Sequence, residues 1–141
     1  MQVFLPFKNV YLTAKCLDKR RRHKQIIECR QIMAALDGTS KGWRNHPVAK
    51  MYAKHREFLN NYLVCLELFH NGLYTRAKVV SDICKDYLPS FITDEYCNNM
   101  KRRLFTKDPI FYKDFAIFGK SYENWYFDIE NNNWKIYKQN N

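Results

Sequence analysis

A single carboxylate, Glu28, stands among cations on one face of a predicted helix. The run Lys15–Leu36 has no Pro or Gly, carries an Asp near its start and is rich in long straight-chain residues, as helices are. At 100° per residue, the stripe that contains Glu28 also holds Arg21, Lys24 and Gln31. A carboxylate on such a face can stabilise a positive charge that develops nearby.

The same spacing also has a simpler explanation. A Lys and a Glu four residues apart usually form a solvated surface pair worth roughly a few tenths of a kcal/mol. Here Lys24 precedes Glu28, which is the weaker order. Ile26, Cys29, Met33 and Leu36 form a separate apolar stripe, so the helix can bury one face and leave the Glu28 face open.

The segments on either side of this helix should position it. Residues 1–14 begin with alternating apolar residues and a Pro, which predicts an extended arm that lies on the core and holds the N-terminus in place. Asp37-Gly38 should end the helix, because Gly accepts the left-handed conformation found there. Residues 38–43 are predicted to form a loop.

A long core helix is predicted from the cap residues Asn45-His46-Pro47 to Asn71-Gly72. Its apolar stripe is formed by Val48, Tyr52, His55, Leu59, Tyr62, Leu66 and Phe69. On this stripe His55 is expected to be a hydrogen-bonded core histidine rather than a ligand.

Shorter elements are predicted in the second half of the chain. One helix runs from Thr75 to Tyr87, and another begins at the cap residue Thr93. Near the end of the latter, Lys101, Arg102 and Arg103 suit the negative end of the helix dipole and are equally suited to phosphate. A further helix spans 108–115, and residues 124–129 and 133–137 should form a small hairpin. We expect one all-α domain, residues 1–141, with an irregular, aromatic-rich C-terminal segment.

The charge distribution indicates an anionic partner. The net charge is +10, and residues 1–44 alone hold ten basic and three acidic side chains. A basic face on a small domain is typical of proteins that bind a phosphate-rich polymer, because neutralised phosphates release counterions. The alternative is that the excess charge serves solubility.

Cysteines and motifs exclude several classes of site. The five Cys are odd in number and lack C-x-x-C or close Cys/His spacing, so neither disulfides nor a zinc site is expected. The chain also lacks a Gly-rich phosphate loop and the carboxylate cluster of a metal-dependent nuclease. No stretch has the roughly 18 apolar residues of a membrane span. Reduced thiols favour a cytoplasmic protein, and we expect it to be a monomer without a metal site or membrane association.

The combined motifs resemble those of the pyrimidine-dimer DNA glycosylase family. They are L-D-x-x-R-x-x-K-Q-x-x-E-x-x-Q-I from Leu17, G-W-x-N-H-P from Gly42, N-G-x-Y from Asn71 and K-D-P-x-F-Y from Lys107. The resemblance covers most of the chain and is closest over residues 1–72. It implies an all-α glycosylase with lyase activity that acts on damaged double-stranded DNA without a cofactor.

The resemblance also assigns roles to particular residues. It implies that the α-amine of the first residue attacks the sugar C1′, that the base departs, and that the resulting Schiff base permits β-elimination. Gln2 is too large for the usual removal of the initiator, so this amine belongs to Met1. The glutamate that stabilises the cationic sugar matches Glu28.

DNA contacts are expected around these two residues. Basic side chains suited to backbone phosphates are Arg20, Arg21, Lys24 and Arg44, and Gln25 belongs to the same matching motif. Trp43, or Trp125 and Tyr126, could stack on unpaired bases. His46 could contact phosphate or simply cap its helix.

Other functions stay open at this point. Ile26 and Ile27 stand where the family has basic or aromatic residues, so the substrate could be another lesion or a modified base. A non-catalytic nucleic-acid-binding or genome-packaging protein is the main alternative. An RNA-directed enzyme is a third.

Overall fold

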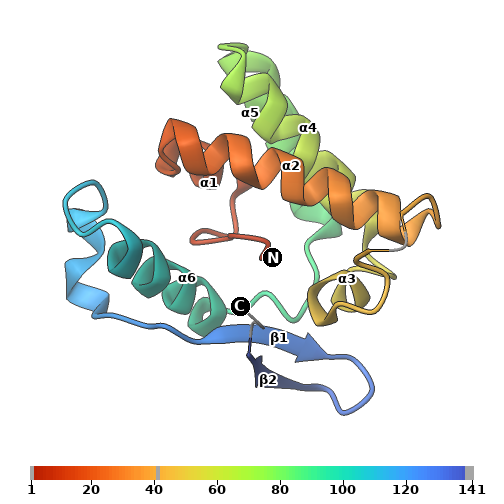
Figure 1. Cartoon of the computed structure of the whole chain (residues 1–141). Coiled ribbons are helices and arrows are strands. Elements are labelled where there is room, and N and C mark those ends of the chain that lie inside the picture. Colours follow the sequence, from red (N-terminus) through yellow and green to blue (C-terminus); the bar gives the residue numbers. More distant parts are fainter. Residues whose placement is uncertain (1, 41, 139–141) are drawn as a thin grey trace.

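The computed structural model describes residues 2–40 and 42–138, which are mostly helical and include one small antiparallel hairpin (Figure 1). This agrees with the helical class and with the hairpin predicted from the sequence. The elements in chain order are α1 (Val10–Cys16), α2 (Lys19–Leu36), α3 (Pro47–Met51), α4 (Arg56–His70), α5 (Tyr74–Cys84), η1 (Lys85–Tyr87), α6 (Asp94–Lys107), η2 (Lys113–Phe118), β1 (Asn124–Asp128) and β2 (Asn133–Tyr137).

The helix predicted from Lys15 is two helices. Leu17 has an extended backbone (φ −68°, ψ 134°), and Asp18 begins α2 by accepting a hydrogen bond from the Arg21 N–H. This side-chain cap satisfies a helix N–H that the preceding turn would otherwise have to bond, so a new helix begins there. The extended arm is correspondingly shorter than predicted, because Asn9 caps α1 and residues 10–14 are helical.

The long core helix predicted from residue 47 to residue 71 is also interrupted. α3 ends at Met51, and Tyr52 and His55 have non-helical backbone angles before α4 begins. The fully buried Tyr52 packs against Phe58 and Phe91, while the half-buried His55 lies edge-on to the same Phe91 ring. The apolar spacing continues across the interruption, which is why the pattern did not reveal it.

In the second half of the chain, the capping prediction at Thr93 is confirmed. Thr93 caps α6 by accepting a hydrogen bond from the Tyr96 N–H at 3.2 Å. The short helix predicted over 108–115 is displaced, since residues 109–112 form turns and η2 follows them. In the hairpin, Trp125 pairs with Ile136 and Asn124 with Tyr137.

The N-terminal arm, residues 2–9, lies between α2 and α6 (Figure 1). Val3 and Leu5 are fully buried in the core. The main-chain oxygens of Val3 and Phe4 accept hydrogen bonds from the hydroxyls of Tyr96 and Tyr62, at 2.8 and 2.6 Å. The predicted docking of this arm is thus confirmed for the described residues.

Within the two described stretches of the chain, no helix combines the length and apolar character that crossing a membrane requires.

Candidate active site

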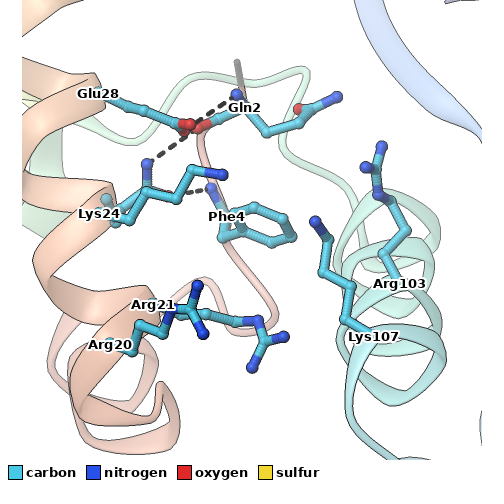
Figure 2. A pocket seen from close by; sticks show the side chains of 9 residues that line it. Gln2, Phe4, Arg20, Arg21, Lys24, Glu28, Arg103 and Lys107 are labelled. Atoms are coloured by element: carbon cyan, nitrogen blue, oxygen red, sulfur yellow. Dashed lines mark hydrogen bonds between the residues drawn. The ribbon is translucent and has the colours of Figure 1, made fainter. Parts of the chain in front are cut away.

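A pocket of about 280 Å³ lies between α2 and α6, with the N-terminal arm as its third wall (Figure 2). Side chains from all three segments point into it. It is lined by Gln2, Phe4, Arg20, Arg21, Lys24, Gln25, Glu28, Arg103 and Lys107. The predicted polar stripe of α2 therefore forms one wall of the pocket, and α6 supplies the opposite wall.

Glu28 lies at the end of the pocket where the arm begins. Its Oε2 accepts a hydrogen bond from the main-chain N–H of Gln2 at 3.3 Å (Figure 2). The side chain is half-buried, and Lys24 lies one turn earlier on the same face of α2. The hydrogen bond from Gln2 therefore holds the Glu28 carboxylate in a position where it also lines the pocket.

Gln2 is fixed from both sides. It is only 3 % exposed, and its main-chain oxygen accepts a hydrogen bond from Gln25 Nε2 at 2.9 Å. Its own side-chain Nε2 donates to the main-chain oxygen of Trp125 at 3.2 Å and to the hydroxyl of Tyr137 at 3.3 Å. Residue 2 thus joins α2 to the C-terminal hairpin.

Gln25, expected among the DNA contacts, has a different position. It is 2 % exposed, and its Oε1 accepts a hydrogen bond from the Phe4 N–H at 2.5 Å. Its amide therefore bonds to the arm at both ends, through Phe4 and through Gln2. Gln25 supports the backbone beneath the pocket instead of facing solvent.

Met1, the expected nucleophile, lies outside the described residues. Gln2, which is covalently bonded to Met1, is the first residue that the structure describes.

Arg21 is held in place by acidic and aromatic neighbours. Its guanidinium lies 3.2 Å from Asp18 and 3.8 Å from Asp108, and above the ring of Tyr112 at 5.8 Å. Asp18 also accepts a hydrogen bond from the Tyr112 hydroxyl. Burial favours the neutral form of Asp18, but the bonds from Tyr112 and Arg21 outweigh it, so the pKa of this carboxyl is lowered.

The cations of α6 come close to those of α2. Arg103 is 9 % exposed and donates to the main-chain oxygen of Glu123 at 2.8 Å and to Asn124 Oδ1 at 2.5 Å. The pKa of Lys107 is lowered by burial first, and then by the positive charges of Arg103, Lys24 and Arg21. The positive charges in this pocket lie close enough to repel one another, so the pocket is suited to bind an anion such as phosphate.

Phe4 supplies the apolar part of the pocket wall. Its ring lies 5.9 Å from the guanidinium carbon of Arg103 and 5.8 Å from Lys107 Nζ. Both of its main-chain polar groups are hydrogen-bonded, to Gln25 and Tyr62. The ring is therefore a fixed surface in a largely charged site.

Three of the expected DNA contacts, Trp43, Arg44 and His46, lie apart from the described residues that line this pocket. His46 caps α3, because its Nδ1 accepts from the Val48 N–H at 3.1 Å, and burial lowers its pKa. Its ring lies edge-on to Trp43 at 5.4 Å and to Tyr137 at 5.1 Å. Arg44 is exposed. The capping role considered for His46 is thus present.

Of the basic cluster near the end of α6, Arg103 faces the pocket. Arg102 instead donates to the main-chain oxygen of Phe118 at 2.8 Å, and Lys101 lies over the rings of Phe7 and Phe118. These two residues hold η2 on α6.

The sequence did not indicate several residues of the site. Phe4 belongs to the apolar arm, Lys107 to the motif K-D-P-x-F-Y and Tyr137 to the predicted hairpin, and none of these patterns points to a site residue. The spacing of Arg103 and Lys107, four residues apart, is the one signal that would have placed both on one helix face. Among the described residues, no group of three or more His, Cys, Asp or Glu side chains is placed to hold a metal ion.

The sequence model for "pyrimidine dimer DNA glycosylase" matches residues 1–77, which contain the arm, α2 and Glu28. No curated protein matches the chain, and no solved structure matches it.

Proposed function

The chain belongs to the pyrimidine dimer DNA glycosylase family, and from this premise we propose that it removes a damaged pyrimidine from double-stranded DNA and then nicks the strand. The α-amine of Met1 is the proposed nucleophile, and Glu28 its electrostatic partner. The contact that carries this proposal is the 3.3 Å hydrogen bond from the Gln2 N–H to Glu28 Oε2.

The covalent chain explains why this contact matters. The α-nitrogen of a residue lies less than about 4 Å from the nitrogen of the next residue, whatever the conformation. The amine of Met1 is therefore one residue from a nitrogen that is itself bonded to Glu28. Under this proposal the amine and the Glu28 carboxylate act on the same sugar carbon.

The proposed reaction has two stages. In the first, the neutral amine attacks C1′, the bond from C1′ to the base nitrogen breaks, and the base leaves with the electron pair of that bond and gains a proton. The nitrogen gives up one proton on attack; the C1′–O4′ bond of the sugar ring then breaks, O4′ takes up a proton, and the nitrogen lone pair forms the protonated Schiff base with C1′. In the second stage a base removes a proton from C2′, and the C3′–O bond breaks to give the β-elimination product.

Glu28 has two roles in this scheme. Its negative charge stabilises the cationic sugar and the protonated Schiff base, as carboxylates do in glycoside cleavage. Its oxygens can also take the protons that the amine and the sugar release. Both roles require an ionised carboxylate close to C1′.

A terminal amine suits this chemistry better than an unperturbed lysine. With a pKa of about 7.7–8.0, an α-amine is roughly 10–20 % neutral at pH 7, whereas a lysine near 10.4 is about 0.04 % neutral. The amine thus needs no special burial to be nucleophilic.

The pocket cations supply the contacts for DNA. Arg20, Arg21 and Lys24 on one wall face Arg103 and Lys107 on the other, so a strand passing between α2 and α6 would meet positive charge on both sides (Figure 2). Phe4 offers a flat apolar surface to a sugar or base between them.

Borohydride trapping tests the proposal. Duplexes carrying a cyclobutane pyrimidine dimer or an abasic site are incubated with the protein and borohydride, and adducts are mapped by peptide mass analysis. We expect a covalent adduct on Met1 that is lost when the α-amine is acetylated. Intact mass measured beforehand establishes that Met1 is present and unmodified.

The outcomes separate the candidate functions. An adduct on a lysine, or none with either duplex, would overturn the proposed nucleophile. Binding without any adduct or strand cleavage would favour a non-catalytic DNA-binding protein. An adduct with the abasic duplex alone would retain the lyase step and refute the removal of a dimerised base.

A further inference from the structure

The hairpin formed by β1 and β2 lies beyond residues 1–77, the part of the chain that the family match covers. It nevertheless contacts the residue next to the N-terminus, through two hydrogen bonds from Gln2 Nε2. We infer that this hairpin is a clamp that holds the start of the chain at Glu28, with Gln2 and Tyr137 as positioning residues. This inference rests on the proposed function, in which the reacting amine belongs to Met1.

The two acceptors of the clamp come from different strands. Trp125 contributes a main-chain oxygen from β1, and Tyr137 a hydroxyl from β2. In the hairpin register Trp125 pairs with Ile136, the residue directly before Tyr137. Strand pairing therefore holds the two residues that carry the acceptors in a fixed register, and an amide nitrogen with two hydrogens can bond to both acceptors.

The clamp and Glu28 hold opposite ends of the same residue. The main chain of Gln2 bonds to Glu28 and Gln25 on α2, while its side chain bonds to the hairpin. Without the side-chain bonds, the remaining hydrogen bonds of residue 2 to described residues all run to α2. Reaction rates fall steeply when a reacting group is displaced by about 1 Å, so this second attachment bears on chemistry as well as on stability.

The hairpin itself is anchored well enough to serve as a fixed point. Trp134 stacks on Tyr96 of α6 at 4.5 Å, and Phe127 stacks on Phe91 at 5.0 Å. Arg103 bonds to the chain just before β1, through the main-chain oxygen of Glu123. Arg103, which lines the pocket, is therefore directly hydrogen-bonded to the segment that leads into the clamp.

The hydroxyl of Tyr137 stays protonated under working conditions. Burial raises the pKa of Tyr137 to about 12, and Glu28 adds to this rise while Arg103 opposes it. A neutral hydroxyl can accept the Gln2 hydrogen bond without placing a second negative charge beside Glu28. Its ring also lies edge-on to His46 at 5.1 Å, which fixes its orientation.

The test compares Gln2→Met, Tyr137→Phe and the double variant with the wild type. Methionine matches the length of glutamine and lacks its hydrogen-bond donors. It is also too large at position 2 for the usual removal of the initiator Met1. Tyr137→Phe removes one oxygen and leaves the ring contacts, so it tests the clamp even if Gln2→Met folds poorly. Tyr87→Phe, an equivalent change at an exposed position on η1, is the control.

We expect each single variant to form the borohydride-trapped adduct on an abasic duplex about 10-fold more slowly in single turnover. The double variant should be no slower than the slower single one, because both changes break the same connection. Duplex affinity without borohydride should stay within about 2-fold, since no pocket cation is altered. Tyr87→Phe should match the wild type in both measurements.

A pH profile separates positioning from a general loss of structure. A carboxylate nearby raises the pKa of an amine, so an amine released from Glu28 should have a lower pKa. The pH midpoint of trapping should therefore shift downward in the clamp variants. Unchanged trapping rates in folded variants would overturn the clamp while leaving the proposed function intact. A wild type that forms no adduct at Met1 would overturn both.

Discussion

Gln2 and Glu28 are 26 positions apart in the chain, and the main-chain N–H of one donates to the carboxylate of the other across 3.3 Å. The bond joins the arm to α2, the helix that carries Arg20, Arg21 and Lys24 of the pocket. It places an acid beside residue 2, the first residue that the structure describes. The proposed chemistry depends on this relationship more than on any other contact in the molecule.

Glu28→Gln should separate binding from catalysis. Glutamine keeps an oxygen that can accept from the Gln2 N–H, so the arm should stay docked, but it cannot stabilise a cationic sugar by charge. We expect single-turnover strand cleavage to fall by about 100-fold or more, with duplex affinity unchanged within about 2-fold.

Glu67→Gln is the matched control for this experiment. Glu67 is a half-buried carboxylate on α4 that pairs with Arg30, and it does not line the pocket. It should leave cleavage unchanged. Cleavage by Glu28→Gln at the wild-type rate would remove Glu28 from the mechanism.

The sequence identified the Glu28 face because that face depends on one helix alone. Arg21, Lys24 and Glu28 share a stripe by helical geometry, and nothing elsewhere in the fold can separate them. The hairpin followed from local signals in the same way, with an Asn-rich turn in which Asn132 adopts φ +52°.

The rest of the site depends on packing that no local pattern encodes. Arg103 and Lys107 reach the pocket only because α6 lies opposite α2 across the arm. The contact between Gln2 and Tyr137 joins residues 135 positions apart. Helix interruptions were missed for a related reason: Asp18 is a side-chain cap within an unbroken helical composition, and Tyr52 keeps the apolar spacing while leaving the helix.

Gln25→Leu should destabilise the protein by releasing the arm. The variant leaves the Phe4 N–H and the Gln2 main-chain oxygen without their Gln25 partners in a buried setting. Buried polar groups that lose a partner cost about 1–3 kcal/mol each. We expect the free energy of unfolding in urea to fall by about 2–4 kcal/mol.

Gln31→Leu, at a half-buried position on the same helix, is the control and should change the free energy of unfolding by less than about 1 kcal/mol. Equal effects at the two positions would contradict the supporting role of Gln25.

Asp18 should make stability depend on pH in the acid range. The folded pKa of this carboxyl is lowered, since bonds from Tyr112 and Arg21 outweigh burial. Its contribution is therefore fully present above the unfolded pKa, near 3.8, and is lost as pH falls through the lower folded value. Asp18→Asn keeps the helix cap but not the charge. The stability difference between wild type and Asp18→Asn should be constant from pH 5 to pH 7 and shrink below about pH 4. A difference independent of pH would show that the charge of Asp18 contributes nothing.

The salt dependence of DNA binding tests which cations contact phosphate. Each phosphate contact contributes about 0.9 to the slope of log affinity against log salt concentration. Lys24→Ala and Lys107→Ala remove one cation from each wall of the pocket, so each should lower the slope by about 1 and weaken binding most at low salt. Lys107 adds a further signature, because burial, and after it the neighbouring cations, lowers its pKa. Bound phosphate should raise the pKa of Lys107 again. DNA binding by the wild type should therefore take up protons at alkaline pH, and binding by Lys107→Ala should not.

Lys54→Ala is the control for the salt slopes. It removes an exposed cation outside the pocket and should keep the wild-type slope. Slopes lowered equally by all three variants would mean that net charge, and not the pocket between α2 and α6, attracts the DNA.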